Sequence, residues 1–209
     1  DTIQKRIVNS ELSNEKSYIY SDLPYYFFKS FLENKYNRTL NQLLKEKLLN
    51  NIGANNTTYL PLNFFSESRL VPSEVDNYFR QDTLKGYVHD MGAAMQGGIG
   101  GHAGLFSNSN DISKIMQMFI QNGNYGSKIF FSKSTIDYFN QCYYCKEGNR
   151  RGLGFDKPQI DDSSPTCGCV PMSSFGHSGF TGTYAWADPD NQIVYVFLSN
   201  RTYPSMNNN

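Results

Sequence analysis

The stretch SFGHSGFTGTYAWADPDNQIVYVFLSN, residues 174–200, decides the fold. Its two halves are rich in aromatic and β-branched residues, which favour β-strands, and DPDN at 188–191 supplies a turn between them. The sequence GLGFD at 152–156 has the same character. We therefore predict that residues 150–201 form adjacent antiparallel strands.

Helical patterns precede these strands. Residues 23–36 carry apolar side chains at helical spacing, and Asp22 is placed to cap the first turn. Thr39 and Gln42 make a capping-box pattern in front of a leucine stripe that stops at Gly53. The same signals predict two further helices, at 108–121 and 132–141.

Between these helical patterns, residues 57–104 are irregular and rich in Pro and Gly. A loop of this length is usually functional or wraps over a neighbouring lobe. The whole chain, 1–209, is long enough for one core. We expect one α+β domain, with a mainly helical lobe and its Gly-rich loop at 20–141 and the antiparallel strands at 150–201.

The composition is that of an ordinary folded protein. Apolar residues make up 39% of the chain, there are fifteen Tyr and fifteen Phe, and the formal net charge is zero. These values exclude a disordered chain and give no reason to expect a nucleic-acid partner. No apolar run approaches the ~20 residues that cross a bilayer, so no membrane span is predicted.

Three landmarks in the sequence carry a resemblance to a known family. Tyr20-Ser21-Asp22 stands before the first long helix, a Gly-rich segment follows at 88–115, and His177-Ser178-Gly179 lies on a predicted strand. In this order they resemble the Tyr-x-Asn motif, the loop and the Lys-Thr-Gly motif of class C β-lactamases and D-alanyl-D-alanine carboxypeptidases. The resemblance is closest to β-lactamase-like modules that some Bacteroidetes carry fused behind a glycoside hydrolase family 3 domain.

The resemblance implies a β-lactamase/transpeptidase-like fold, N-terminally incomplete, and assigns roles to particular residues. Tyr20 takes the place of the catalytic base, and a tyrosine serves as a base only where positive charge or hydrogen bonds stabilise its phenolate. His177 stands where the family has a strand lysine. The backbone N–H of Phe180 would stabilise the oxyanion.

Three more residues are implied to contact the substrate, namely Asp22, Ser178 and Gly179. Asp22 departs from the family's asparagine, whose amide can donate to an acyl-amide side chain of a substrate. An ionised carboxylate can only accept hydrogen bonds. This difference disfavours β-lactam-like recognition and leaves two alternatives, an amine-bearing peptide substrate or an Asp that holds the neighbouring cation. The expected partner is a small peptide or ester substrate.

The nucleophile of the family lies in a Ser-x-x-Lys motif at the start of a buried helix. The one match here, Ser13 to Lys16, lies only seven residues before Tyr20 and has polar neighbours. We expect the true motif to lie in sequence absent from this chain, and we predict little or no turnover by the chain alone. The alternative is a non-catalytic module that binds cell-wall peptide or glycan.

The four cysteines form a second pattern, Cys142-Tyr-Tyr-Cys145 followed by Cys167-Gly-Cys169. Paired short spacings suit a structural Cys₄ zinc site, whereas an exported protein favours two disulfides. Both alternatives stay open, and either is expected to staple the excursion between the two pairs. No cofactor is expected for catalysis.

The remaining charged motifs are interpreted as structural. His89, Asp90 and His102 in the Gly-rich segment make a poor metal-ligand set, so we expect them to take part in hydrogen bonds. Arg150 and Arg151 are interpreted as a solvated approach to a strand, although guanidinium groups also bind substrate carboxylates. The family resemblance implies a periplasmic or other extracytoplasmic location, and a fused glycoside hydrolase domain upstream.

Overall fold

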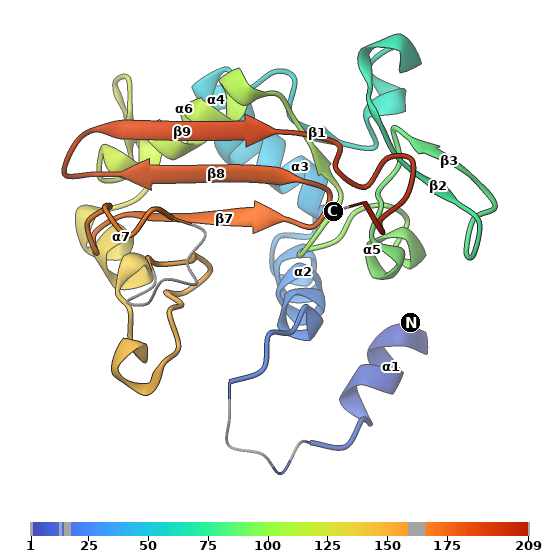
Figure 1. The fold of residues 1–209 in the computed structure, drawn as a ribbon, viewed down its shortest axis with the longest axis horizontal. Helices are drawn as coiled ribbons and strands as arrows, with labels where there is room; N and C mark the ends of the chain where they lie inside the picture. The colour runs from blue at the N-terminus through green and yellow to red at the C-terminus, as the bar shows by residue number, and fades with distance from the viewer. Residues whose placement is uncertain (1, 13, 15–17, 159–165, 209) are drawn as a thin grey trace.

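A three-stranded antiparallel sheet and one helix form the centre of the computed structural model, which describes residues 2–12, 14, 18–158 and 166–208. Strands β7 (Phe175–Gly179), β8 (Thr183–Asp188) and β9 (Ile193–Leu198) lie in the order β7-β8-β9. Helix α6 (Ser109–Ile120) packs across β8 and β9, as Figure 1 shows.

The main core lies between this helix and the sheet. Met116 and Ile120 of α6 pack against Phe175 of β7 and Ala187 of β8. The prediction that residues 174–200 form antiparallel strands is confirmed, with the turn at 188–191 in place. GLGFD does not form a strand; it contributes only isolated bridges, of which Asp156 to Gly176 joins it to β7.

Helix α2 (Leu23–Tyr36) begins where the sequence predicts, but its cap differs. Asp22 occupies the N-cap position without any side-chain cap hydrogen bond. The Oγ atom of Ser21 instead accepts a hydrogen bond from the Leu23 amide at 3.2 Å. The predicted capping role of the Asp22 carboxylate is therefore wrong, because its backbone is already in the helical region rather than extended.

The leucine-stripe helix forms as predicted, in three joined pieces. These are α3 (Leu40–Leu44), the π-helical turn η1 (Lys45–Leu49) and α4 (Asn50–Ile52). The capping box of Thr39 and Gln42 is present in both directions. Gly53 ends the helix in the left-handed conformation, which glycine adopts at little cost.

Helices α6 and α7 (Lys133–Asn140) match the two other predicted helices. Each begins at a capping side chain, Asn108 for α6 and Ser132 for α7. The shorter elements of the described residues are α1 (Thr2–Val8), the ribbon of β5 (Asn124–Tyr125) and β6 (Lys128–Ile129), and η4 (Cys145–Glu147).

Residues 57–104 contain more regular structure than the sequence predicts. This segment contains a hairpin of β2 (Pro72–Asp76) and β3 (Asp82–Lys85) and the short elements β1 (Thr58–Tyr59), η2 (Pro61–Asn63), η3 (Glu67–Arg69) and α5 (Met91–Met95). Directly after it, β4 (Leu105–Phe106) pairs with β1. The hairpin strands are polar, and distant residues hold them: Val75 donates to the carbonyl of Pro204 at 2.9 Å.

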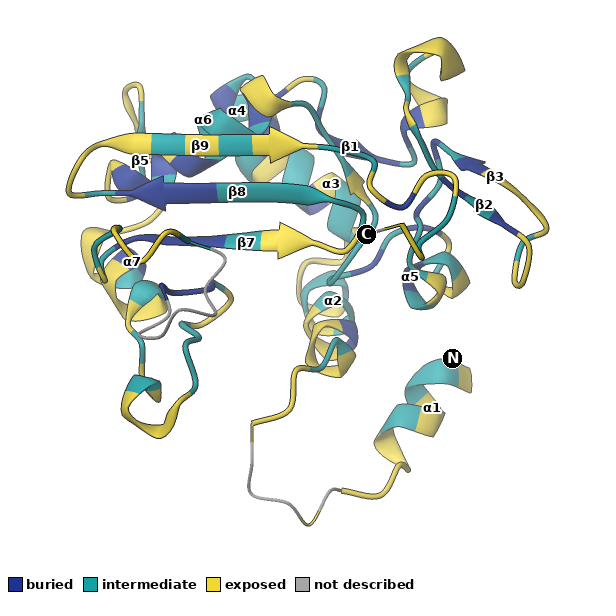
Figure 2. Cartoon of the chain, viewed as in Figure 1, coloured by how far each residue is buried: buried dark blue, intermediate teal, exposed yellow. Residues whose placement is uncertain are grey.

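The exposed surface includes several large aromatic side chains. Phe27, Phe28 and Phe31 on α2 are exposed, as are Tyr195 and Phe197 on β9, and Figure 2 shows the exposed stretches along both elements. None of the helices among the described residues is long and apolar enough to cross a bilayer.

Candidate active site

The sheet side of the candidate site is the C-terminal end of β7, where His177, Ser178 and Gly179 follow one another. The ring of His177 has both nitrogens engaged. Nδ1 lies 2.6 Å from the carbonyl oxygen of Ser178, which can only accept. Nε2 lies 2.8 Å from Nη1 of Arg151, which can only donate. His177 is therefore the neutral Nδ1–H tautomer and supplies no positive charge.

The positive charge at this place belongs to Arg151. Its guanidinium lies 4.9 Å from the ring centroid of Tyr20, and its Nη1 lies 2.7 Å from Oδ1 of Asp156. Asp156 is buried, with 3% of its side chain exposed, and it also pairs with Arg150 at 3.3 Å. Because 79% of the Arg151 side chain is covered, the prediction of a solvated arginine is wrong.

Sequence reasoning missed Arg151 because its contacts are long-range. Tyr20 and His177 lie far from it in the chain, and only the bridge from Asp156 to Gly176 brings the segment to β7. A usable signal was present in the sequence: the basic pair Arg150-Arg151 stands directly before GLGFD, next to the predicted strands.

Tyr20 forms the other side of the site and is 58% exposed. Partial burial and the negative charge of Asp22 raise the pKa of the Tyr20 phenol, and the nearby Arg151 opposes them without cancelling them. The phenolate is thus disfavoured in this chain. A role as base needs more stabilisation of the phenolate than Arg151 provides here.

Phe180 follows the strand at the tip of the β7–β8 turn. Among the described residues, none accepts a hydrogen bond from the Phe180 amide, which leaves this N–H free for an oxyanion. Ser178 and Gly179 are exposed beside it. A Cβ at Gly179 would meet the Oγ1 of Thr183, so a larger residue here would require the Thr183 side chain to move.

Asp22 lies in a cluster with Asp90 and His102. One ligand atom from each lies within 4.8 Å of the others, so this set could hold a metal ion. Nε2 of His102 donates to Oδ1 of Asp90 at 2.8 Å, and the same oxygen caps α5 at the Ala93 amide. The hydrogen bond from His102 lowers the pKa of Asp90.

The predicted structural hydrogen bonding of the histidines is confirmed. His102 pairs with Asp90, and Nε2 of His89 lies 2.9 Å from Oε2 of Glu74. Ser13 and Lys16, the one Ser-x-x-Lys match, lie outside the residues that the structure describes.

The four cysteines form two local disulfides, Cys142–Cys145 and Cys167–Cys169. In this state no thiolate among them is available to zinc. The predicted staple across the excursion is wrong, because each bond closes its own short loop rather than joining the two pairs. The first loop still touches the site indirectly: Cys142 lies against the carbonyl of Asn149, and Oδ1 of Asn149 accepts from the Arg151 amide at 3.1 Å.

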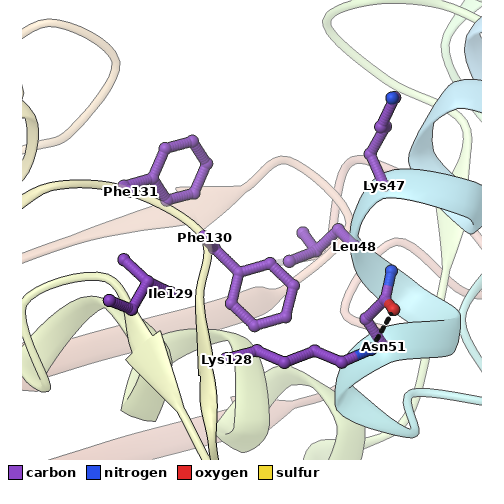
Figure 3. A pocket seen from close by; sticks show the side chains of 7 residues that line it. All are labelled: Lys47, Leu48, Asn51, Lys128, Ile129, Phe130 and Phe131. Carbon is purple, nitrogen blue, oxygen red and sulfur yellow. Dashed lines mark hydrogen bonds between the residues drawn. The ribbon is translucent and has the colours of Figure 1, made fainter.

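A separate pocket of about 440 Å³ lies between η1–α4 and the β5–β6 ribbon. Figure 3 shows Leu48 and Phe130 facing each other across it, with Lys128 donating to Asn51 below them. It contains none of the predicted site residues.

Two features define the class of the protein as a β-lactamase/penicillin-binding-protein-like domain. One is the tyrosine corner before a helix, and the other is the end of an antiparallel strand that carries a His-Ser-Gly triplet. The family model described as Beta-lactamase matches residues 4–209. The chain belongs to this family.

Curated relatives agree with this assignment. The chain is 32% identical over 199 residues to a putative D-alanyl-D-alanine carboxypeptidase of Escherichia coli K12, covering 89% of this chain and 45% of that protein. It therefore spans about half the length of the curated relatives that it matches.

Solved structures share the fold at low sequence identity. A putative β-lactamase from Bacteroides dorei matches with a TM-score of 0.61 at 15% identity, over 95% of this chain and 56% of that one. EstCE1, a hydrolase with promiscuous acyltransferase activity, matches with a TM-score of 0.60 at 14% identity, over 88% of this chain and 51% of that one.

Proposed function

We propose that this chain supplies the strand wall and the tyrosine corner of a serine acyl-hydrolase site. The nucleophile would come from a Ser-x-x-Lys motif in sequence beyond these 209 residues. The observation that carries the proposal is the placement of Arg151 between Tyr20 and His177, at 4.9 Å from the ring of one and 2.8 Å from the other. It puts a fixed positive charge beside the residue that must handle a proton.

The proposed reaction is acyl transfer through an acyl-enzyme. The serine oxygen attacks the substrate carbonyl while its proton passes to the base, and the Phe180 N–H binds the resulting oxyanion. Collapse of this intermediate breaks the bond to the leaving group, which takes up the proton through Tyr20. Water then attacks the ester by the same steps and releases the acid. The incoming lysine of Ser-x-x-Lys would add the positive charge that Tyr20 lacks here.

The substrate that we propose is a small peptide amide or ester. The relatives named as putative D-alanyl-D-alanine carboxypeptidases make a peptide ending in D-alanyl-D-alanine the first substrate to test. Arg151 supports this choice, because a guanidinium next to the strand end can bind a terminal carboxylate with two parallel hydrogen bonds. The two disulfides support a periplasmic or other extracytoplasmic location.

The test uses a longer protein in which this chain follows a Ser-x-x-Lys motif. It should release D-alanine from the peptide or hydrolyse a small ester, and a fluorophosphonate should label the serine of its Ser-x-x-Lys motif. Replacing that serine with alanine should abolish both. If the serine variant is as active as wild type, the proposed function is wrong. Covalent labelling of a serine in the 209-residue chain itself would contradict our prediction that it is inactive alone.

Arg151→Gln is the sharper variant in the same protein. It keeps a hydrogen-bond donor for His177 but removes the charge beside Tyr20. We expect kcat/KM to fall about 10- to 100-fold, less than the ~10²–10³-fold lost with a direct oxyanion-hole donor, because Arg151 acts on the base and not on the oxyanion. Arg38→Gln, at an exposed ion pair with Glu46, should leave kcat/KM unchanged.

The alternative function is a non-catalytic module that binds a cell-wall peptide or glycan. Two observations favour it: His177 is neutral where the family has a lysine, and Asp22 stands where the family has asparagine. Binding without turnover distinguishes it. Measurable affinity of the longer protein for a D-alanyl-D-alanine peptide, with no D-alanine released and no serine labelled, would replace the enzyme proposal by this one.

A further inference from the structure

Phe180 is 63% exposed, yet its ring and its backbone both have contacts with distant segments of the chain. Its ring contacts two side chains from distant segments. The ring centroid of His89 is 5.4 Å away, and the guanidinium of Arg201 is 5.3 Å from the Phe180 centroid. The proposed function does not use either contact.

The backbone around Phe180 is fixed as well. The carbonyl of Gly179 accepts a hydrogen bond from the Gly182 amide at 3.0 Å, inside the turn. The peptide between Gly179 and Phe180 is planar and trans, so the Phe180 N–H points the opposite way, out of the turn. On the other side, Nη2 of Arg201 donates to the Phe180 carbonyl at 2.8 Å.

Both partners are themselves held firmly. The second nitrogen of Arg201, Nη1, donates hydrogen bonds to the carbonyls of Met206 at 3.3 Å and Asn208 at 2.8 Å. Its guanidinium therefore bridges the turn and the C-terminal segment. His89 is bonded to Glu74, whose side chain is almost fully buried on the β2–β3 hairpin. The main chain of His89 accepts a hydrogen bond from Arg80 at 2.7 Å.

We infer that Arg201 and His89 are positioning residues that fix the direction of the Phe180 amide. Each group on the Phe180 Cα has a partner: the preceding Gly179 carbonyl bonds to Gly182, the Phe180 carbonyl to Arg201, and the ring contacts both His89 and Arg201. This inference rests on the proposed function, because it assigns these contacts to an oxyanion site. A preorganised donor needs no rearrangement when the charge develops, which is why such restraint affects rate rather than binding.

The inference predicts that the turn at residues 179–182 becomes mobile when the Arg201 contacts, here called the clamp, are removed from the 209-residue chain. In Arg201→Ala, hydrogen exchange of the Gly182 amide should rise about ten-fold or more, since a hydrogen bond from a charged donor contributes a free energy of that size. Arg201→Lys should recover part of the protection. Arg69→Ala is the matched control, because Arg69 also lies over a phenylalanine, at 4.4 Å from Phe65, and away from the turn. Unchanged Gly182 exchange in Arg201→Ala would overturn the clamp.

A second measurement, in a longer protein that carries this chain behind a Ser-x-x-Lys motif, tests the link to the oxyanion. Arg201→Ala and His89→Gln should lower kcat about 10- to 100-fold with little change in KM. A boronic acid forms a tetrahedral adduct on the serine, and its binding affinity should fall by a similar factor. A rise in KM alone, with kcat and boronate affinity intact, would show a merely structural role. If the wild-type protein neither hydrolyses the substrate nor is labelled by a fluorophosphonate, the proposed function and this oxyanion role are both wrong. Hydrogen exchange of the Gly182 amide then tests only whether Arg201 and His89 hold the turn.

Discussion

The two sides of the candidate site are held in different ways. On the sheet side, β7 is hydrogen-bonded along its length to β8, and Phe175 at its start is 1% exposed in the main core. On the tyrosine side, Tyr18, Ile19 and Tyr20 are all exposed, and Tyr20 meets the rest of the site through the guanidinium of Arg151. The strand wall is thus built by burial, whereas the tyrosine corner depends on a few contacts at the surface.

The difference explains why one side of the site is complete within this chain. Strand β7 is fixed by its pairing with β8 and by the core under its start, and the turn that follows it is bonded to Arg201 of the same chain. Tyr20 has a raised pKa and an exposed ring, so it needs a further partner before it can act as a base. The proposed Ser-x-x-Lys segment would be that partner.

Phe175→Ala should give the largest loss of stability, because it removes a fully buried ring from the core between α6 and the sheet. We expect the free energy of unfolding to fall by about 3–5 kcal/mol. Phe28→Ala, on the exposed face of α2, removes the same side chain and should change it by about 0.5 kcal/mol or less. Urea denaturation measures both, and equal losses would contradict the contrast between the two sides.

Much of the architecture was predictable because its signals are local. Strands β7 to β9 combine β-forming residues with a turn of Asp, Pro and Asn, and the helix after Thr39 carries its own capping box. The β2–β3 hairpin was not predictable, because its polar strands are held by partners about 130 residues away, such as Thr202 on the Ser73 carbonyl. The role of Arg151 in the site was not predictable for the same reason, because its partners are distant in the chain.

The β2–β3 hairpin is stabilised by the hydrogen bonds of a buried carboxylate. Asp76, buried on β2, accepts hydrogen bonds from the Arg80 side chain at 2.6 Å and from the amides of Phe79 and Tyr78. Burial alone would raise the pKa of Asp76, but these hydrogen bonds outweigh it and hold the pKa well below its ordinary value. The stabilisation is fully present above the unfolded-state pKa of ~3.9 and is lost as the pH falls from there through the lower pKa of the folded state.

Asp76→Asn should therefore lower the stability at pH 7 and flatten its dependence on pH below about 4. The measurement is urea denaturation at pH 7 and at pH 3 for wild type and variant. Asp82→Asn, at the exposed position opposite Asp76 on β3, is the control and should follow wild type. A variant with the same steep acid dependence as wild type would show that Asp76 is not the group responsible.

The smallest effects concern the starts of two helices. Thr39→Ala removes a cap that accepts from the Gln42 amide, and should cost about 1 kcal/mol. Asp22→Ala, at the start of α2, removes no capping hydrogen bond and should cost less than about 0.5 kcal/mol. If the Asp22 variant loses as much stability as the Thr39 variant in urea denaturation, then Asp22 caps α2 after all.

The central claim is that Tyr20 is a working part of an acyl-hydrolase site rather than an exposed aromatic residue. Tyr18→Phe is a matched control, because Tyr18 is two residues away and 53% exposed against 58% for Tyr20. The direct measurement is the rate of serine acylation by a small ester in the longer protein. Tyr20→Phe should lower this rate about 10²- to 10⁴-fold, as expected for a lost general base, while Tyr18→Phe leaves it unchanged. Equal acylation rates in Tyr20→Phe and wild type would contradict the account.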